Sequence, residues 1–156
     1  MPRVVVDDRL ITGQNPYSTI GVAEAVVRAT GRMPVARKAG RDELSLDLVE
    51  RFLTGNGEAA RAELAADPER FHVQLIAMLG YYQLKAAETE EAASDALAVM
   101  ELAAVHFEAP QLTIGIAEGH LRLGRVARAR ELLESVLASE PDLAEARQLM
   151  ERIDRT

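Results

Sequence analysis

Cysteine and tryptophan are absent from the 156 residues, and aromatic side chains make up only 4%. Without cysteine the chain has no disulfide, no thiolate zinc site and no cysteine nucleophile. Basic residues are also scarce: 18 Lys and Arg stand against 25 Asp and Glu, which gives a net charge of −7. Because nucleic-acid phosphates repel an acidic chain, we expect no general nucleic-acid binding.

Long apolar runs are missing as well. The N-terminal run consists of three valines, residues 4–6. A secretory signal needs an apolar stretch of about 7–15 residues, and a helix that spans a bilayer needs about 20. We therefore expect a cytoplasmic protein with no membrane partner.

The charge divides the chain in two. Residues 1–41 contain seven basic and three acidic side chains, whereas residues 42–156 contain eleven and twenty-two. Residues 32–41 are basic, contain proline and glycine, and show neither helix nor strand periodicity, which indicates a linker. We expect this linker to be a solvated tether; the alternative is a contact with the acidic helices that follow. The predicted parts are an N-terminal segment (1–31), a basic linker (32–41) and a C-terminal domain (42–156).

The C-terminal domain is rich in alanine, leucine, glutamate and arginine, which favour helices. Helices are predicted to start at Asp67, Thr89, Pro110 and Pro141, since a capping side chain or a first-turn proline favours a helix start. The turns between them are short, so neighbouring helices should be antiparallel.

A repeat is visible over residues 116–141. If Pro141 closes the repeat, then small or apolar residues occupy its packing and turn positions, and they are Ala117, Gly124, Ala129 and Val136. A weaker copy lies 37 residues earlier, and residues 142–154 have the polar-backed pattern of a capping helix. Residues 73–154 therefore resemble tetratricopeptide repeats. The resemblance implies an array of antiparallel helix hairpins with a concave, peptide-binding groove; a plain helical bundle is the alternative.

The first residues have a different pattern. Two β-rich runs flank the polar residues 7–9, which predicts a hairpin. A loop and a helix capped by Ser18 or Thr19 and ended by Gly31 follow. A hairpin and one helix bury too little surface to be stable alone. The predicted fold class is mainly α: a helix-hairpin array with a small N-terminal β-hairpin plus helix.

Residues 10–18 read LITGQNPYS, and together with their neighbours (3–30) they resemble the C-terminal end of the ThiJ/PfpI family, which is class I glutamine amidotransferase-like. The resemblance implies that residues 1–31 are the remnant of an α/β domain, in which Gly13, Asn15 and Ser18 line a pocket. The simpler interpretation gives these three residues roles in turns and in a helix cap.

The family's catalytic cysteine would lie upstream, so we expect this chain to be a non-catalytic interaction module rather than an enzyme. The alternative is that it is the tail of a truncated or split ThiJ/PfpI-type enzyme.

The resemblance to tetratricopeptide repeats places His120 in the groove, where tyrosine is usual. The other groove candidates are Arg122, Arg125 and Tyr82. Arginines suit a carboxylate clamp; the alternative is that the arginines of residues 122–130 pair with neighbouring glutamates.

No cofactor is expected. The histidines of the chain, His72, His106 and His120, lack the i, i+4 spacing of a helical metal site, so no metal is expected. The expected partner is a protein or peptide in the groove, and the open edge of the hairpin also favours self-association.

Overall fold

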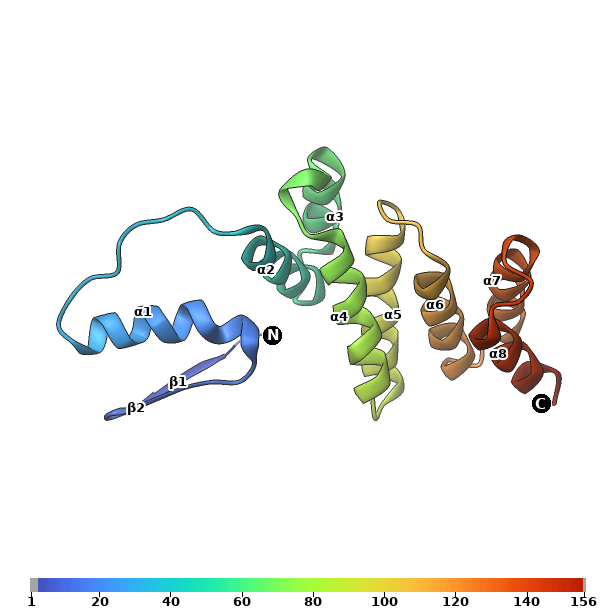
Figure 1. The fold of residues 1–156 in the computed structure, drawn as a ribbon, viewed down its shortest axis with the longest axis horizontal. Helices are drawn as coiled ribbons and strands as arrows, with labels where there is room; N and C mark the ends of the chain where they lie inside the picture. Colours follow the sequence, from blue (N-terminus) through green and yellow to red (C-terminus); the bar gives the residue numbers. More distant parts are fainter. Residues whose placement is uncertain (1–2, 156) are drawn as a thin grey trace.

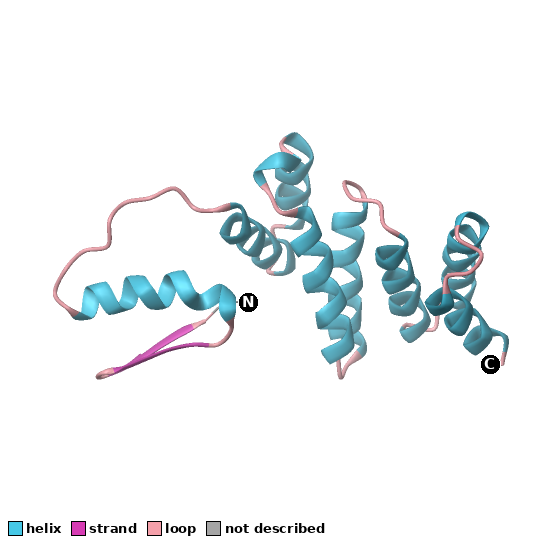
Figure 2. Ribbon diagram, viewed as in Figure 1, coloured by secondary structure: helices cyan, strands magenta, loops and turns pink. Residues whose placement is uncertain are grey.

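The computed structural model describes residues 3–155; residues 1, 2 and 156 of the predicted terminal parts lie outside the described residues. The described chain contains eight α-helices and one two-stranded antiparallel sheet (Figure 2). A hairpin and the first helix lie at one end, an extended segment follows, and the other helices stand in a row (Figure 1). The prediction of a mainly helical chain with a small N-terminal hairpin is confirmed.

The hairpin consists of β1 (Val4–Asp7) and β2 (Leu10–Gly13). Its register places Asp7 opposite Leu10, so Asp7 belongs to the strand and the turn has two residues. Asp8 adopts a positive φ of 50°, which such tight hairpin turns require and which aspartate tolerates.

Helix α1 (Thr19–Ala29) covers one face of this hairpin. The two elements approach closely, because a Cβ atom on Gly21 would lie 2.8 Å from the side chain of Val4. Gly31, with φ 76°, follows the end of the helix as predicted. No side chain of α1 is buried, so this unit has almost no core of its own.

Residues 32–40 have no regular secondary structure, yet they are not a free tether. The guanidinium of Arg37 makes two hydrogen bonds of 2.6 Å to the carboxylate of Glu43 and one of 3.2 Å to Glu24. The linker is therefore joined to α1 on one side and to α2 on the other. The predicted solvated tether is replaced by the alternative contact with the following helix.

The row of helices is built from sequence neighbours. It consists of α2 (Arg41–Leu53), α3 (Gly57–Ala66), α4 (Val73–Ala86), α5 (Glu90–Ala104), α6 (Pro110–Arg122), α7 (Val126–Ser139) and α8 (Ala144–Asp154). From α4 onward each helix packs on the next, and α6 also touches both α4 and α8. The contacts of α4, α6 and α8 bring alternate helices to one side of the row.

Several predicted boundaries are confirmed. The hydroxyl of Thr89 accepts a hydrogen bond from the backbone N–H of Ala92, which caps α5. Pro110 is the first residue of α6, and Gly124 follows the end of α6 with a φ of 70°.

Two helix starts lie later than predicted. Residues Pro68–Arg70 form a separate 3₁₀ turn, and α4 begins at Val73. Between them Phe71 is extended and its side chain is fully buried. The backbone carbonyl of Phe71 accepts a hydrogen bond from Arg41, so contacts with α2 hold this segment away from the helical conformation. Helix α8 likewise begins at Ala144, not at the predicted proline.

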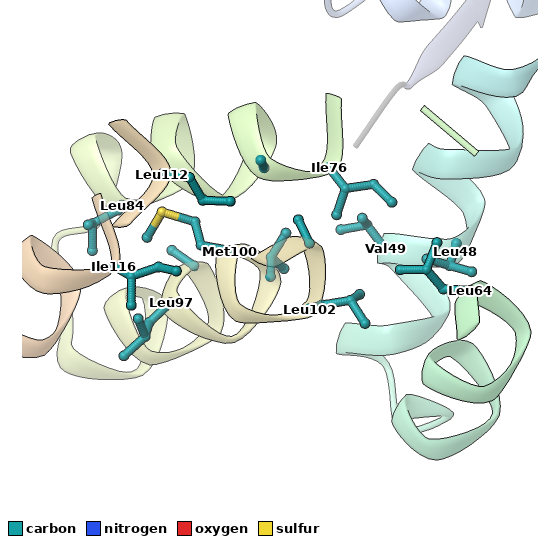
Figure 3. Close-up of a cluster of buried hydrophobic side chains, with 14 of the residues drawn as sticks. Leu48, Val49, Leu64, Ile76, Leu84, Leu97, Met100, Leu102, Leu112 and Ile116 are labelled. Atoms are coloured by element: carbon teal, nitrogen blue, oxygen red, sulfur yellow. The ribbon is translucent and has the colours of Figure 1, made fainter. Parts of the chain in front are cut away.

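The core of the row consists of two clusters of buried side chains. The larger one joins α2 to α6; Figure 3 shows it, including Leu112 and Ile116 of α6. The smaller one joins α6 to α8 and includes Ile114 and Ala117 of α6. Helix α6 therefore contributes to both clusters. Burial of each large aliphatic side chain contributes about 1.5–3 kcal/mol.

Candidate functional site

A groove of about 670 Å³ runs along the side of the row where α4, α6 and α8 meet. Most of its lining comes from α4, α6 and α8, and Met100 of α5 with Phe107 and Ala109 of the following loop completes it. Helix α4 supplies one wall, α6 the floor and α8 the opposite wall.

The α4 wall carries large apolar side chains that remain exposed. Met78, Tyr81 and Tyr82 are 49%, 37% and 62% exposed, at i, i+3 and i+4 of one helix face. The two tyrosine rings meet edge to face with their centroids 5.9 Å apart. Ile114 of α6 and Leu149 of α8 extend the apolar lining. Exposed apolar surface gathered in a hollow is typical of an interaction site.

An ion pair joins the α4 wall of the groove to its α6 floor. The Nζ of Lys85 lies 2.6 Å from a carboxylate oxygen of Glu118, which joins α4 to α6. This hydrogen bond raises the pKa of Lys85 above its ordinary value. The ammonium group also lies 5.1 Å from the centre of the Tyr81 ring, within cation–π range. Glu145 and Arg152 add charges from α8.

Of the predicted groove residues, Tyr82 belongs to the lining, and His120 does not. His120 is only 7% exposed and faces away from the groove, with its Nε2 3.3 Å from a carboxylate oxygen of Glu101 on α5. Residues two apart in an α-helix differ by about 200° around its axis. Because Glu118 faces the groove, His120 must face the other side of α6.

Burial is the main influence on the pKa of His120. The loss of solvation lowers its pKa below the ordinary value, Glu101 partly opposes this effect, and Arg125 and Arg128 add to it. Its Nδ1 is buried without a hydrogen-bond partner. The neutral imidazole is therefore the favoured form, and His120 is a packing residue between α5, α6 and α7.

The arginines predicted for the groove lie outside its lining. Arg122 donates a hydrogen bond to the backbone carbonyl of Leu84, at the C-terminal end of α4. Arg125 precedes α7, and its backbone N–H donates to the carbonyl of His120. Among the nearby arginines, Arg128 pairs with a glutamate of α7 at 2.9 Å, in line with the ion-pair alternative to a carboxylate clamp.

Gly13, Asn15 and Ser18 come together in the N-terminal unit. The buried hydroxyl of Ser18 accepts a hydrogen bond of 3.1 Å from the backbone N–H of Arg3 and lies 3.4 Å from the amide oxygen of Asn15. A Cβ atom on Gly13 would lie 2.8 Å from that of Ser18. Ser18 stands before α1 but makes no side-chain cap. These contacts join the loop after β2 to Arg3, directly before β1, and none of the three residues lines the groove.

The sequence analysis did not include Met78 and Tyr81 among the predicted groove residues. The available signal was the composition of α4, which carries apolar residues on more than one face (Val73–Ala86, VQLIAMLGYYQLKA). A helix that packs by one face needs only a single apolar stripe. Helix α4 packs against α2, α5 and α6, which accounts for its buried apolar residues and leaves Met78, Tyr81 and Tyr82 exposed.

Within residues 3–155 no group of three or more His, Asp or Glu side chains is placed to hold a metal ion. None of the described helices combines the length and the hydropathy needed to cross a membrane. Comparison of the chain with models of known families, with curated proteins and with solved structures found no match.

Proposed function

We propose that the chain is a non-catalytic helical-repeat module that binds a protein partner through a peptide or helix held in the groove of α4, α6 and α8. One observation carries this proposal: Met78, Tyr81 and Tyr82 are exposed together on a wall of a groove lined by alternate helices. Such a surface lowers its free energy when a partner removes it from water.

The proposal includes a tetratricopeptide-like arrangement. Helices α4 and α5 form one hairpin, α6 and α7 a second, and α8 covers the end. Ala117 and Ala129 are fully buried, and they occupy the positions where the repeat requires small residues. This arrangement supports a groove on one side of the row, as the repeat uses for binding.

The lining indicates what kind of segment would fit. Tyrosine combines a large apolar ring with a hydroxyl, and tyrosines often dominate the binding free energy of interfaces. Gln74, Gln111 and Gln148 add amide groups at the groove surface. We expect an amphipathic segment with apolar anchors spaced along one face and polar groups along the other.

We propose further that β1, β2 and α1 correspond to the C-terminal part of an α/β domain of ThiJ/PfpI type. The order strand, turn, strand, loop and helix supports this correspondence, as does the contact of Gly13 with Ser18. The chain has no cysteine to supply the nucleophile of that family. The unit is therefore proposed to be an attachment to the binding module and not a catalytic site.

Selection from a displayed library of random peptides tests the proposed function. Peptides enriched on the native chain should bind Tyr82→Glu at least about tenfold more weakly, because a charge would then lie against apolar anchors. Val105→Glu is the matched control, since Val105 is 75% exposed and lies outside the groove lining. The proposal fails if no peptide is enriched or if enriched peptides bind both variants equally.

A further inference from the structure

The outer edge of β1 is open within the described chain, because β2 is its sole neighbour. The backbone N–H of Gln14 donates to the carbonyl of Arg3, which places these two residues at a hydrogen-bonded position of the ladder, and the N–H of Arg3 donates to Ser18 instead. Such pairs alternate along an antiparallel ladder. Residues 5 and 7 therefore bond toward β2, whereas the N–H and C=O groups of Val4 and Val6 point outward without strand partners.

We propose that β1 pairs antiparallel with β1 of a second copy, so that two hairpins form one four-stranded sheet in a symmetric dimer. The sequence of the strand is self-complementary about Val5. In this register Arg3 lies opposite Asp7 of the second copy, Val4 lies opposite Val6, and Val5 meets its own equivalent. Opposite charges and β-branched residues are both favourable cross-strand pairs.

The same register satisfies the hydrogen bonds. A hydrogen-bonded pair in an antiparallel ladder exchanges two N–H···O=C bonds. Val4 and Val6 carry the outward backbone groups and lie opposite each other, so each symmetric half of the junction completes one such pair. A shift by one residue would instead place Val4 opposite Val5, whose backbone groups already bond to β2.

The register also keeps the faces of the sheet consistent. Val4 contacts α1, and Val6 shares that face because it is two residues further along the strand. Pairing Val4 with Val6 therefore places the α1 helices of both copies on one face. A symmetric pairing of β2 about Thr12 would place Ile11 opposite Gly13, a pair with one side chain, so β2 is the poorer edge.

Exposure and charge support this site. Val5 and Val6 are 59% and 56% exposed, although they form the middle of a strand. Among the described residues neither Arg3 nor Asp7 has an ion-pair partner within its own copy. A two-stranded hairpin is marginal in water, whereas three or more strands with a packed face gain independent stability. The second copy supplies those strands.

Sedimentation equilibrium of the full chain, from about 1 to 100 µM, is the first test. We expect a mass that rises from 17.0 kDa toward twice that value. Val6→Pro removes an outward N–H but leaves the bonds to β2 intact, a position where an edge strand tolerates proline. This variant should remain monomeric over the whole range.

Charge reversal tests the register itself. Arg3→Glu and Asp7→Arg each place two like-charged pairs in the dimer, so each alone should raise the dissociation constant about tenfold. A mixture of the two variants restores opposite charges at both positions, so heterodimers should form about as tightly as the native dimer. Arg9→Glu, an equal change in the exposed hairpin turn, is the control and should dimerise as the native chain does.

A native chain that is monomeric at every concentration overturns the proposal. A dimer that survives Val6→Pro, or that shows no rescue in the mixture, also overturns it, because another surface would then hold the copies together. Circular dichroism confirms that each variant is folded, and the mixing experiment reports a gain of binding that a misfolded variant would not give.

Discussion

A Cβ atom on Gly80 would lie 2.9 Å from the backbone carbonyl oxygen of Ala96 and equally close to the backbone nitrogen of Met100. This contact sets how closely α4 approaches α5. These two atoms are backbone and cannot rotate away, and the Cγ atom of the Met100 side chain would lie closer still, at 2.7 Å. We predict that Gly80→Ala lowers the free energy of unfolding by about 1–3 kcal/mol, despite the better helix propensity of alanine. Urea denaturation monitored by circular dichroism measures this free energy of unfolding.

Gly119→Ala is the matched control for this prediction. A Cβ atom there would lie 3.1 Å from a terminal methyl group of Leu97, which belongs to a rotatable side chain. The gain in helix propensity, about 1 kcal/mol, should offset the cost of that adjustment. If the two variants are equally destabilised, the close approach to Ala96 does not explain the glycine at position 80.

The burial of His120 predicts a dependence of stability on pH. Its pKa lies below the ordinary 6.5 in the folded chain, mainly because burial disfavours the charged imidazole. Between the two values the unfolded chain binds more protons, so stability rises with pH. The contribution is complete above about pH 6.5 and is lost as the pH falls to the folded pKa, with about 1.4 kcal/mol for each unit of difference. The midpoints of urea unfolding between pH 7.5 and pH 5 measure this pH dependence of stability.

His120→Gln removes this titration while retaining a side-chain donor near Glu101. The loss of stability on acidification should become smaller in this variant. His106→Gln replaces a less buried histidine and should leave the dependence as it is in the native chain. An unchanged pH profile in His120→Gln would contradict the assignment of the effect to this residue.

Ser18 is predicted to hold the hairpin against α1. Ser18→Ala removes the hydroxyl that accepts from the backbone N–H of Arg3 and leaves that donor without its partner. The loss of one such bond costs about 1 kcal/mol. Hydrogen exchange of the β1 amides should accelerate, while exchange in α4 and α5 should not change. Equal acceleration in all of these elements would indicate global destabilisation instead.

The pairing of Arg37 with Glu43 predicts how the linker responds to protease. The hydrogen bond with Arg37 lowers the pKa of Glu43, and Glu43 also accepts from the backbone N–H of Gly40. Glu43→Gln weakens the charge-assisted contact, so trypsin should cleave after Arg37 and Lys38 faster than in the native chain. Glu50→Gln, an exposed change on the same helix, is the control and should leave the rate unchanged. Added salt should accelerate cleavage of the native chain, since it screens exposed charges.

Local signals in the sequence were sufficient for much of the fold. Thr89, Pro110 and Gly124 mark helix boundaries because their effects act within one turn of the chain. The start of α4 was misplaced because Phe71 is held by a distant helix: Arg41, thirty residues away, bonds to its carbonyl. Helix-capping rules describe residues that are close in the sequence, so they could not predict this contact.

The candidate site was less accessible to sequence reasoning. Tyr82 was among the predicted groove residues, but His120 was placed on the wrong side of α6, where its contact with Glu101 of another helix buries it. The face that a helix turns toward its neighbours depends on the rotation of the helix about its axis. Helix α6 carries the small residues Gly115, Ala117 and Gly119 on more than one face, so the pattern alone does not fix that rotation.

The division of the core at α6 has a consequence for the timing of binding. Helix α8 packs against the smaller cluster alone, whereas Leu132 of α7 also contacts the larger one, so α8 can open while the larger cluster stays intact. Such an opening removes the α8 wall, and with it Leu149, from the groove. A bound segment that contacts Leu149 would slow amide exchange in α8 far more than in α5. Under the proposed function, a segment held against Leu149 is released when α8 opens, so the rate of this opening would limit its residence time.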